Sequence, residues 1–172
     1  DYLEDDELVK KVASLIKDGK IIGWFQGRTE FGARALGNRS ILANPYIADI
    51  KARVNKVIKK REGFRPFAPI VKWEATETYF ENDKEIPYMN QIVSVKKQFR
   101  DKLPAITHID GSARIQTLKK YQCKRIYALL EKLEERESFI IELFNIAMHP
   151  DKFNDIDKFT TIYNKYNQII NK

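Results

Sequence analysis

The segment KIIGWFQGRTEFGARALGNRSILANP, residues 20–45, carries the clearest structural pattern in the chain. Its apolar start, residues 20–25, predicts a buried strand, and residues 40–43 predict a second, short strand. Residues 26–38 between them are rich in arginine and glycine. The glycines that permit positive φ angles and close backbone approach to a ligand are Gly27, Gly32 and Gly37. We therefore expect two strands joined by a long, positively charged loop.

Outward from this segment, helical and strand patterns alternate. Residues 5–18 predict an amphipathic helix that Asp5 or Asp6 caps and Gly19 ends. Residues 47–60 predict a basic helix with inward-facing Ile50, Val54, Val57 and Ile58. The remaining expected elements are strands at 70–72, 89–95, 113–118 and 138–144, helices at 74–80, 124–136 and 155–170, and loops at 82–88 and 99–113. This order predicts one domain over residues 1–172, α/β or α+β in class.

Composition narrows the classes of protein that fit. The chain has 172 residues, 43% of them hydrophobic and 32% charged, which is ordinary for a globular domain. No apolar run approaches the roughly 20 residues of a membrane helix, and the acidic residues 1–7 do not resemble a secretory signal. Cys123 is the only cysteine, which excludes an internal disulfide and favours a reducing, cytoplasmic setting.

The net charge of +7 favours anionic partners, and its arginines crowd the first half of the chain. They are Arg28, Arg34, Arg39, Arg53, Arg61 and Arg65. Guanidinium forks, loop amides and the Ser40 hydroxyl all suit phosphate oxygens. The segment is neither a P-loop nor a dinucleotide fingerprint, because both glycine patterns are missing. The alternative is a structural network in which these arginines pair with Glu30 and nearby carboxylates.

A second candidate region lies between residues 104 and 114. His108 beside Asp110 suits acid–base chemistry or ligand binding. The alternative is that His108 caps a turn and Asp110 forms an Asx-turn before Gly111. Among the aromatic residues, we expect Trp24 and Phe25 in the core, and packing rather than adenine stacking for Phe64 and Phe67.

Three motifs together resemble the NodU/CmcH carbamoyltransferase family. GWFQGRTEFGARALGNRSILANP (23–45) resembles the signature that opens the family's C-terminal domain, with Ala33 where the family usually has proline. FRPFAPIV (64–71) and PAITHIDGSARIQTL (104–118) resemble its second and third signatures. The resemblance covers about residues 8–145, and the tail from about residue 146 diverges from the family pattern.

The resemblance implies a YrdC-like domain, with a twisted mixed sheet flanked by helices. It implies an enzyme, one part of an O-carbamoyltransferase, that binds carbamoyl phosphate and ATP with Mg²⁺ and forms a carbamoyl-adenylate. It also implies a partner, the family's ASKHA-type N-terminal domain with its iron site, which lies outside these residues and transfers the carbamoyl group to a hydroxyl or amine. No metal site is expected in this chain. The acceptor molecule is not indicated.

From the motifs and the resemblance together, we expect catalytic roles for Arg34, Arg65 and His108. The expected substrate- and nucleotide-binding residues are Arg28, Glu30, Arg39, Ser40, Asp110 and Arg114. The alternative function is a non-catalytic YrdC-like module that binds a nucleotide or RNA. The chain lacks interleaved aromatic and basic patches suited to base stacking, which disfavours nucleic acid.

Overall fold

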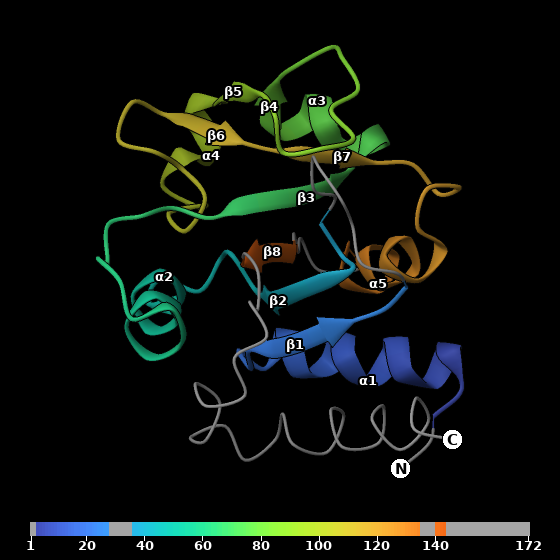
Figure 1. The fold of residues 1–172 in the computed structure, drawn as a ribbon. Helices are drawn as coiled ribbons and strands as arrows, with labels where there is room; N and C mark the ends of the chain where they lie inside the picture. Colours follow the sequence, from blue (N-terminus) through green and yellow to red (C-terminus); the bar gives the residue numbers. More distant parts are fainter. Residues whose placement is uncertain (1–2, 28–35, 135–139, 144–172) are drawn as a thin grey trace.

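A mixed five-stranded sheet forms the centre of the molecule (Figure 1). The computed structural model describes residues 3–27, 36–134 and 140–143. Across the sheet, in order, lie β1 (Ile22–Phe25), β2 (Arg39–Ala43), β8 (Ile140–Leu143), β3 (Ala68–Lys72) and β7 (Gln116–Leu118). Strands β3 and β7 are parallel, and the other neighbouring pairs are antiparallel. The mixed sheet with its helices confirms the predicted fold class.

Two helices cover one face of this sheet. They are α1 (Asp5–Lys17) and α5 (Lys124–Glu134), which also contact each other. Their apolar sides pack with Trp24, Leu42 and Ile70 of the sheet in one buried cluster. In α1 the buried residues Val9, Val12, Ala13 and Ile16 follow the helical spacing that the sequence shows.

The opposite face is covered by α2 (Ile50–Arg53), the π-helix η1 (Val54–Lys59) and a small second sheet. That sheet holds β4 (Phe80–Glu81), β5 (Ile92–Val95) and β6 (Ser112–Arg114). Along β2, Ile41 and Ala43 pack in a second buried cluster on this face, whereas Leu42 packs in the first cluster, with α1 and α5. Strands β2 and β3 are therefore buried on both faces, as their apolar sequences require.

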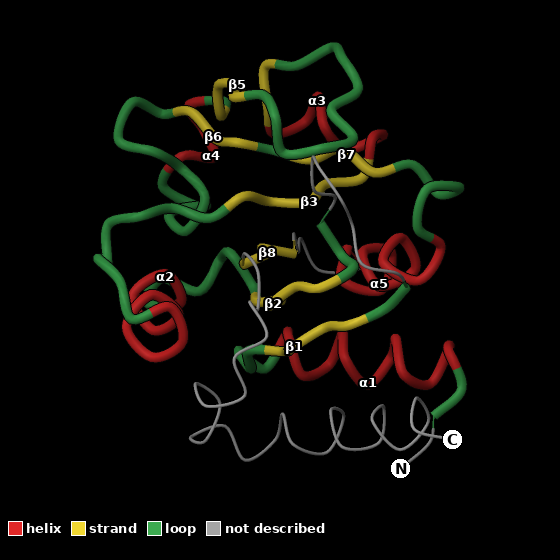
Figure 2. Tube along the Cα trace, viewed as in Figure 1, coloured by secondary structure: helices red, strands yellow, loops and turns green. Residues whose placement is uncertain are grey.

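Three short helices complete the described elements: the 3₁₀-helix η2 (Trp73–Ala75), α3 (Thr76–Tyr79) and α4 (Lys97–Arg100). In Figure 2 the large sheet lies between α1 on one side and α3, α4 and the small sheet on the other. Over the described ranges, no helix combines the length and apolar character that a membrane span needs.

Several local expectations need correction. Val57 is 62% exposed and not inward-facing, because the wider π-helical turn buries Asn55 instead. Neither Asp5 nor Asp6 caps α1, since the cap position is Glu4 and Asp5 pairs with Arg125. The strand expected at 113–118 divides into β6 and β7, which belong to different sheets.

The other local expectations are confirmed, differ at an element's end, or lie outside the described residues. Gly19 does end α1 with a φ of +74°, and the loop expected at 99–113 includes the end of α4. The helix expected at 155–170 and both ends of the strand expected at 138–144 lie outside the described residues.

Leu129→Ala tests the packing of α5 on the sheet. Leu129 is fully buried in the first cluster, so truncation should lower the free energy of unfolding by about 2–5 kcal/mol. Urea denaturation measures this change. Glu131→Ala, at an exposed position of the same helix, should stay within about 0.5 kcal/mol of the parent chain. Equal effects from the two variants would contradict the assigned packing.

Candidate functional site

Of the nine predicted site residues, Arg28, Glu30 and Arg34 lie outside the described residues. The other six occupy three segments. Arg39 and Ser40 begin β2, Arg65 precedes β3, and His108, Asp110 and Arg114 belong to the turn and strand before β7.

Residues 36–38 end the arginine-rich segment between β1 and β2, called the arginine loop below. Three buried polar side chains bond the main chain at this end of the loop. Ser40 Oγ accepts the Gly37 N–H at 3.0 Å, and Gln26 Nε2 donates to the Gly37 carbonyl at 2.7 Å. Gln116 Oε1 accepts the N–H of Leu36. Buried main-chain groups without partners are costly, so these bonds fix where the loop rejoins the fold. The Ser40 oxygen is therefore engaged with the loop's own main chain.

The sequence analysis predicted no role for Gln26 and Gln116. Gln26 also donates to Cys123 Sγ at 3.0 Å, which links the loop to the residue before α5. The sequence did contain a signal, because apolar neighbours mark both positions as buried. Gln26 directly follows one predicted strand, and Gln116 lies inside another. A buried glutamine needs hydrogen-bond partners, and here these are loop main-chain groups and the Cys123 sulfur.

Arg39 lies against the aromatic ring of its cross-strand partner. Phe25 and Arg39 are paired in the β1–β2 register, and the guanidinium carbon lies 4.6 Å from the ring centroid. This cation–π contact positions the guanidinium over the Phe25 ring. Phe25 is 39% exposed, so the expectation of a core position is corrected for Phe25 and confirmed for the buried Trp24.

The three sequence motifs meet in the fold. The second and third join through the parallel strands β3 and β7, where Ile70 pairs with Gln116. Just before β3, the Phe67 N–H donates to the Ala105 carbonyl at 3.0 Å. The first motif joins the third through the bond between Leu36 and Gln116. Segments 80 residues apart are thus connected by direct hydrogen bonds.

The turn at residues 108–112 has the Asx geometry that we gave as the structural alternative. Asp110 Oδ1 accepts the Ser112 N–H at 2.9 Å and the Ser112 hydroxyl at 2.7 Å. The His108 N–H donates to the Ser112 carbonyl, and Gly111 has a φ of +82°. The side-chain and then the main-chain bond from Ser112 lower the pKa of the exposed Asp110 carboxyl.

Arg65 is exposed on the loop after η1. Its Nε pairs with Glu62 Oε2 at 2.9 Å, with both side chains about half exposed. Arg114 lies on β6, partly buried and paired across the sheet with Ile92. The described members of the predicted set, Arg39, Arg65 and Arg114, therefore lie on separate elements.

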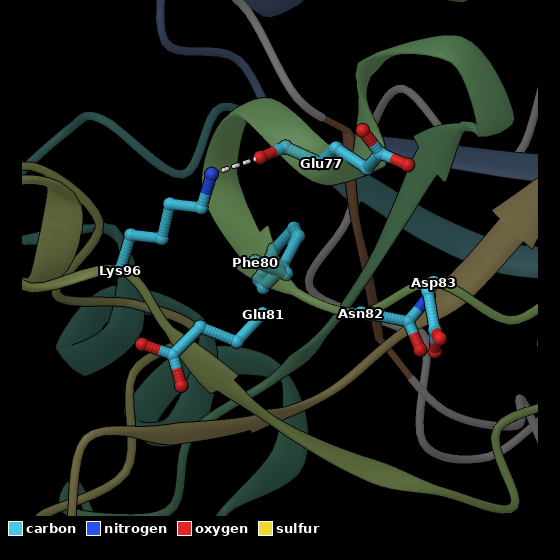
Figure 3. Close-up of a pocket in the computed structure, with 6 residues that line it drawn as sticks. All are labelled: Glu77, Phe80, Glu81, Asn82, Asp83 and Lys96. Carbon is cyan, nitrogen blue, oxygen red and sulfur yellow. Dashed lines mark hydrogen bonds between the residues drawn. The ribbon is translucent and has the colours of Figure 1, made fainter.

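A pocket of about 400 Å³ lies elsewhere, between α3 and the small sheet (Figure 3). Its lining is Glu77, Phe80, Glu81, Asn82, Asp83 and Lys96. The Lys96 amine donates to the Glu77 carbonyl, and the other charged side chains are carboxylates. A phosphate-rich ligand would be repelled by this lining. We therefore place the candidate site at the arginine-bearing segments and not in this pocket.

Comparison with known proteins gives one family. The profile of the family Carbamoyltransferase C-terminus matches residues 13–152. The nodulation protein NolNO of Sinorhizobium fredii is 43% identical over 91% of this chain and 24% of its own length. The 3'-hydroxymethylcephem-O-carbamoyltransferase of Amycolatopsis lactamdurans is 42% identical over 74% of this chain and 23% of its own. The chain spans about a quarter of these relatives.

Two solved structures share the fold. Full-length HypF in its phosphate- and nucleotide-bound form matches with a TM-score of 0.59 and 18% identity, over 83% of this chain and 21% of HypF. E. coli YciO matches with a TM-score of 0.59 and 11% identity, over 87% of this chain and 68% of YciO. At these identities the likeness concerns the fold alone.

Gly37→Ala tests the anchoring of the loop. Gly37 has a φ of +96°, and a Cβ there would lie 2.7 Å from Ile126 Cγ1. Strain and overpacking should lower the free energy of unfolding by about 2–4 kcal/mol in urea denaturation. The matched control is Gly63→Ala, where a Cβ meets open space and φ is not positive, so stability should change by less than about 1 kcal/mol. Equal stability of the two variants would contradict this geometry.

Ser112→Ala tests the turn. Without the hydroxyl donor, the pKa of Asp110 should rise toward its ordinary value, which carboxyl ¹³C NMR titration measures. A lowered folded-state pKa stabilises the folded chain above the unfolded pKa, and that contribution is lost as pH falls through the folded pKa. The variant should therefore lose part of the parent's acid dependence of stability. An unchanged Asp110 pKa would contradict the assigned cause.

Proposed function

Because the chain belongs to the Carbamoyltransferase C-terminus family, we propose that it binds carbamoyl phosphate and ATP and forms a carbamoyl-adenylate. The observation that carries this proposal is the direct bonding of the three arginine-bearing motifs around one sheet. The similarity to the 3'-hydroxymethylcephem-O-carbamoyltransferase supports carbamoyl transfer as the reaction class. HypF, which shares only the fold, binds phosphate and a nucleotide, so a nucleotide substrate suits a domain of this shape.

The proposed reaction has two steps. Water cleaves carbamoyl phosphate to carbamate and inorganic phosphate. A carbamate oxygen then attacks the α-phosphorus of ATP, the new P–O bond forms, and the bond to the β-phosphate breaks to release pyrophosphate. Such a reaction needs alignment of the attacking oxygen and stabilisation of charge on the phosphates, with little covalent help from the protein.

The site residues have corresponding proposed roles. Arg34 and Arg65 are assigned to the charge that develops on the transferring phosphates, with Arg28 and Arg39 on the bound phosphates. His108 remains a proposed acid–base group, and Arg114 a proposed substrate contact. Glu30, Ser40 and Asp110 remain proposed substrate- and nucleotide-binding residues, and Ser40 and Asp110 also bond the main chain of the segments that carry these groups. Mg²⁺ is proposed to arrive with ATP, as its counterion.

The relatives' greater length supports a second domain that receives the product. The chain spans 24% and 23% of the two relatives named above. We propose that the remaining polypeptide transfers the carbamoyl group to an acceptor hydroxyl or amine. Keeping the adenylate between two domains would protect it from water.

Arg34→Ala tests the reaction. The chain should release pyrophosphate only when Mg²⁺, ATP and carbamoyl phosphate are all present, as chromatography of labelled pyrophosphate from ATP labelled at its γ-phosphate reports. Arg34→Ala should lower this rate by at least about 100-fold, because removal of one such charge costs that much. Lys10→Ala, an exposed cation on α1, should keep the parent rate.

A folded chain that releases no pyrophosphate from both substrates would contradict adenylate formation. A steep loss of RNA binding with added salt, without competition from ATP, would instead support the non-catalytic alternative.

A further inference from the structure

Arg100 lies against the turn at residues 108–112, which carries two of the predicted site residues. Arg100 is the last residue of α4, and the turn runs into β6. A Cβ on Gly111 would lie 2.5 Å from Arg100 Nη1 and 2.7 Å from its Nε, so the guanidinium fills the space on that side of the turn. Gly111 is buried and has a φ of +82°. Glycine therefore meets two needs at this position, a positive φ and the close approach of the guanidinium.

Hydrogen bonds to one buried residue connect the guanidinium to the turn. Arg100 Nε donates to the Val95 carbonyl at 2.9 Å. The Val95 N–H donates to the Gly111 carbonyl at 2.9 Å, and Val95 itself is fully buried at the end of β5. Each of these three residues thus contacts the other two. A planar guanidinium can donate at Nε and lie against Gly111 at the same time, whereas a lysine ammonium cannot do both.

A shift of Gly111 would reach His108 through the main chain of the turn. The Gly111 N–H donates to the His108 carbonyl at 2.9 Å, and the His108 N–H donates to the Ser112 carbonyl at 2.8 Å. Ile109, at the tip of the turn, is fully exposed, so its side chain adds no packing that would hold the turn in place. Arg100 limits the movement of the turn, because its guanidinium occupies the space beside Gly111.

We propose that Arg100 is a positioning residue for His108 and fixes where this imidazole lies in the site. The inference rests on the proposed function, in which His108 is the acid–base group. Such a group must lie within hydrogen-bonding reach of the proton that it transfers, and a misplacement of about 1 Å can cost about 100-fold in rate. Arg100 touches no substrate in this proposal and acts only through the turn.

Pyrophosphate release by Arg100→Met tests this role, because methionine keeps an unbranched stem and removes the guanidinium. The kcat should fall about tenfold or more, while the KM for ATP should change less than about threefold. Arg100→Lys should lose as much, since lysine keeps the charge but not the bond from Nε. The matched control is Lys97→Met, which removes an exposed cation of the same helix and should keep kcat within about twofold of the parent value.

A second background separates positioning from a general structural role. In a chain that carries His108→Ala, adding Arg100→Met should lower kcat by less than about twofold, because a positioning residue has no effect once the group that it positions is gone. The same tenfold loss in both backgrounds would overturn the proposal, since Arg100 would then act on the fold or on another group.

NMR spectra of the same variants distinguish this inference from the proposed reaction. Arg100→Met and Arg100→Lys should shift the amide signals of residues 108–112 and the ring signals of His108, whereas Lys97→Met should not. Unchanged signals in the Arg100 variants, or a parent kcat in either, would overturn the positioning role. Shifted signals in a chain that releases no pyrophosphate would support the positioning of His108 and contradict the reaction. If Arg100→Met fails to fold by circular dichroism, Arg100→Lys still decides.

Discussion

The hydrogen bonding of the main chain at Leu36 and Gly37 is the constraint on which the rest of the site depends. These residues return the arginine loop to the buried sheet, where water is excluded and each N–H and C=O needs a partner. Gln26, Ser40 and Gln116 supply those partners. Arg39 follows within two residues and is held against Phe25. Because the end of the loop is fixed, the position of the Arg39 guanidinium is fixed as well.

The same principle operates at the second arginine segment. Asn55 satisfies the carbonyls of Gly63 and Arg65 and at the same time orients Arg61. At η1 a buried amide orients the Arg61 guanidinium directly, whereas at the loop end the buried polar side chains fix the main chain just before Arg39.

Much of the fold followed from periodicity. Helix α1 and strands β1 and β2 were expected within two residues of their observed bounds, because their apolar patterns are regular. The π-helix was not expected, since a single widened turn leaves no repeat to detect, and Val57 was therefore placed inside. The division of residues 113–118 into β6 and β7 depends on pairing with distant strands, which local pattern cannot show. For the same reason, the roles of Gln26, Asn55 and Gln116 became visible only through their partners.

We propose that the arginine-bearing segments, and not the acidic pocket beside α3, bind the substrate phosphates. A crystal of the chain soaked with ATP and Mg²⁺ tests it most directly. We expect triphosphate density next to residues 36–39 and 61–65. Triphosphate density confined to the pocket lined by Glu77, Glu81 and Lys96, or distant from every arginine segment, would contradict it.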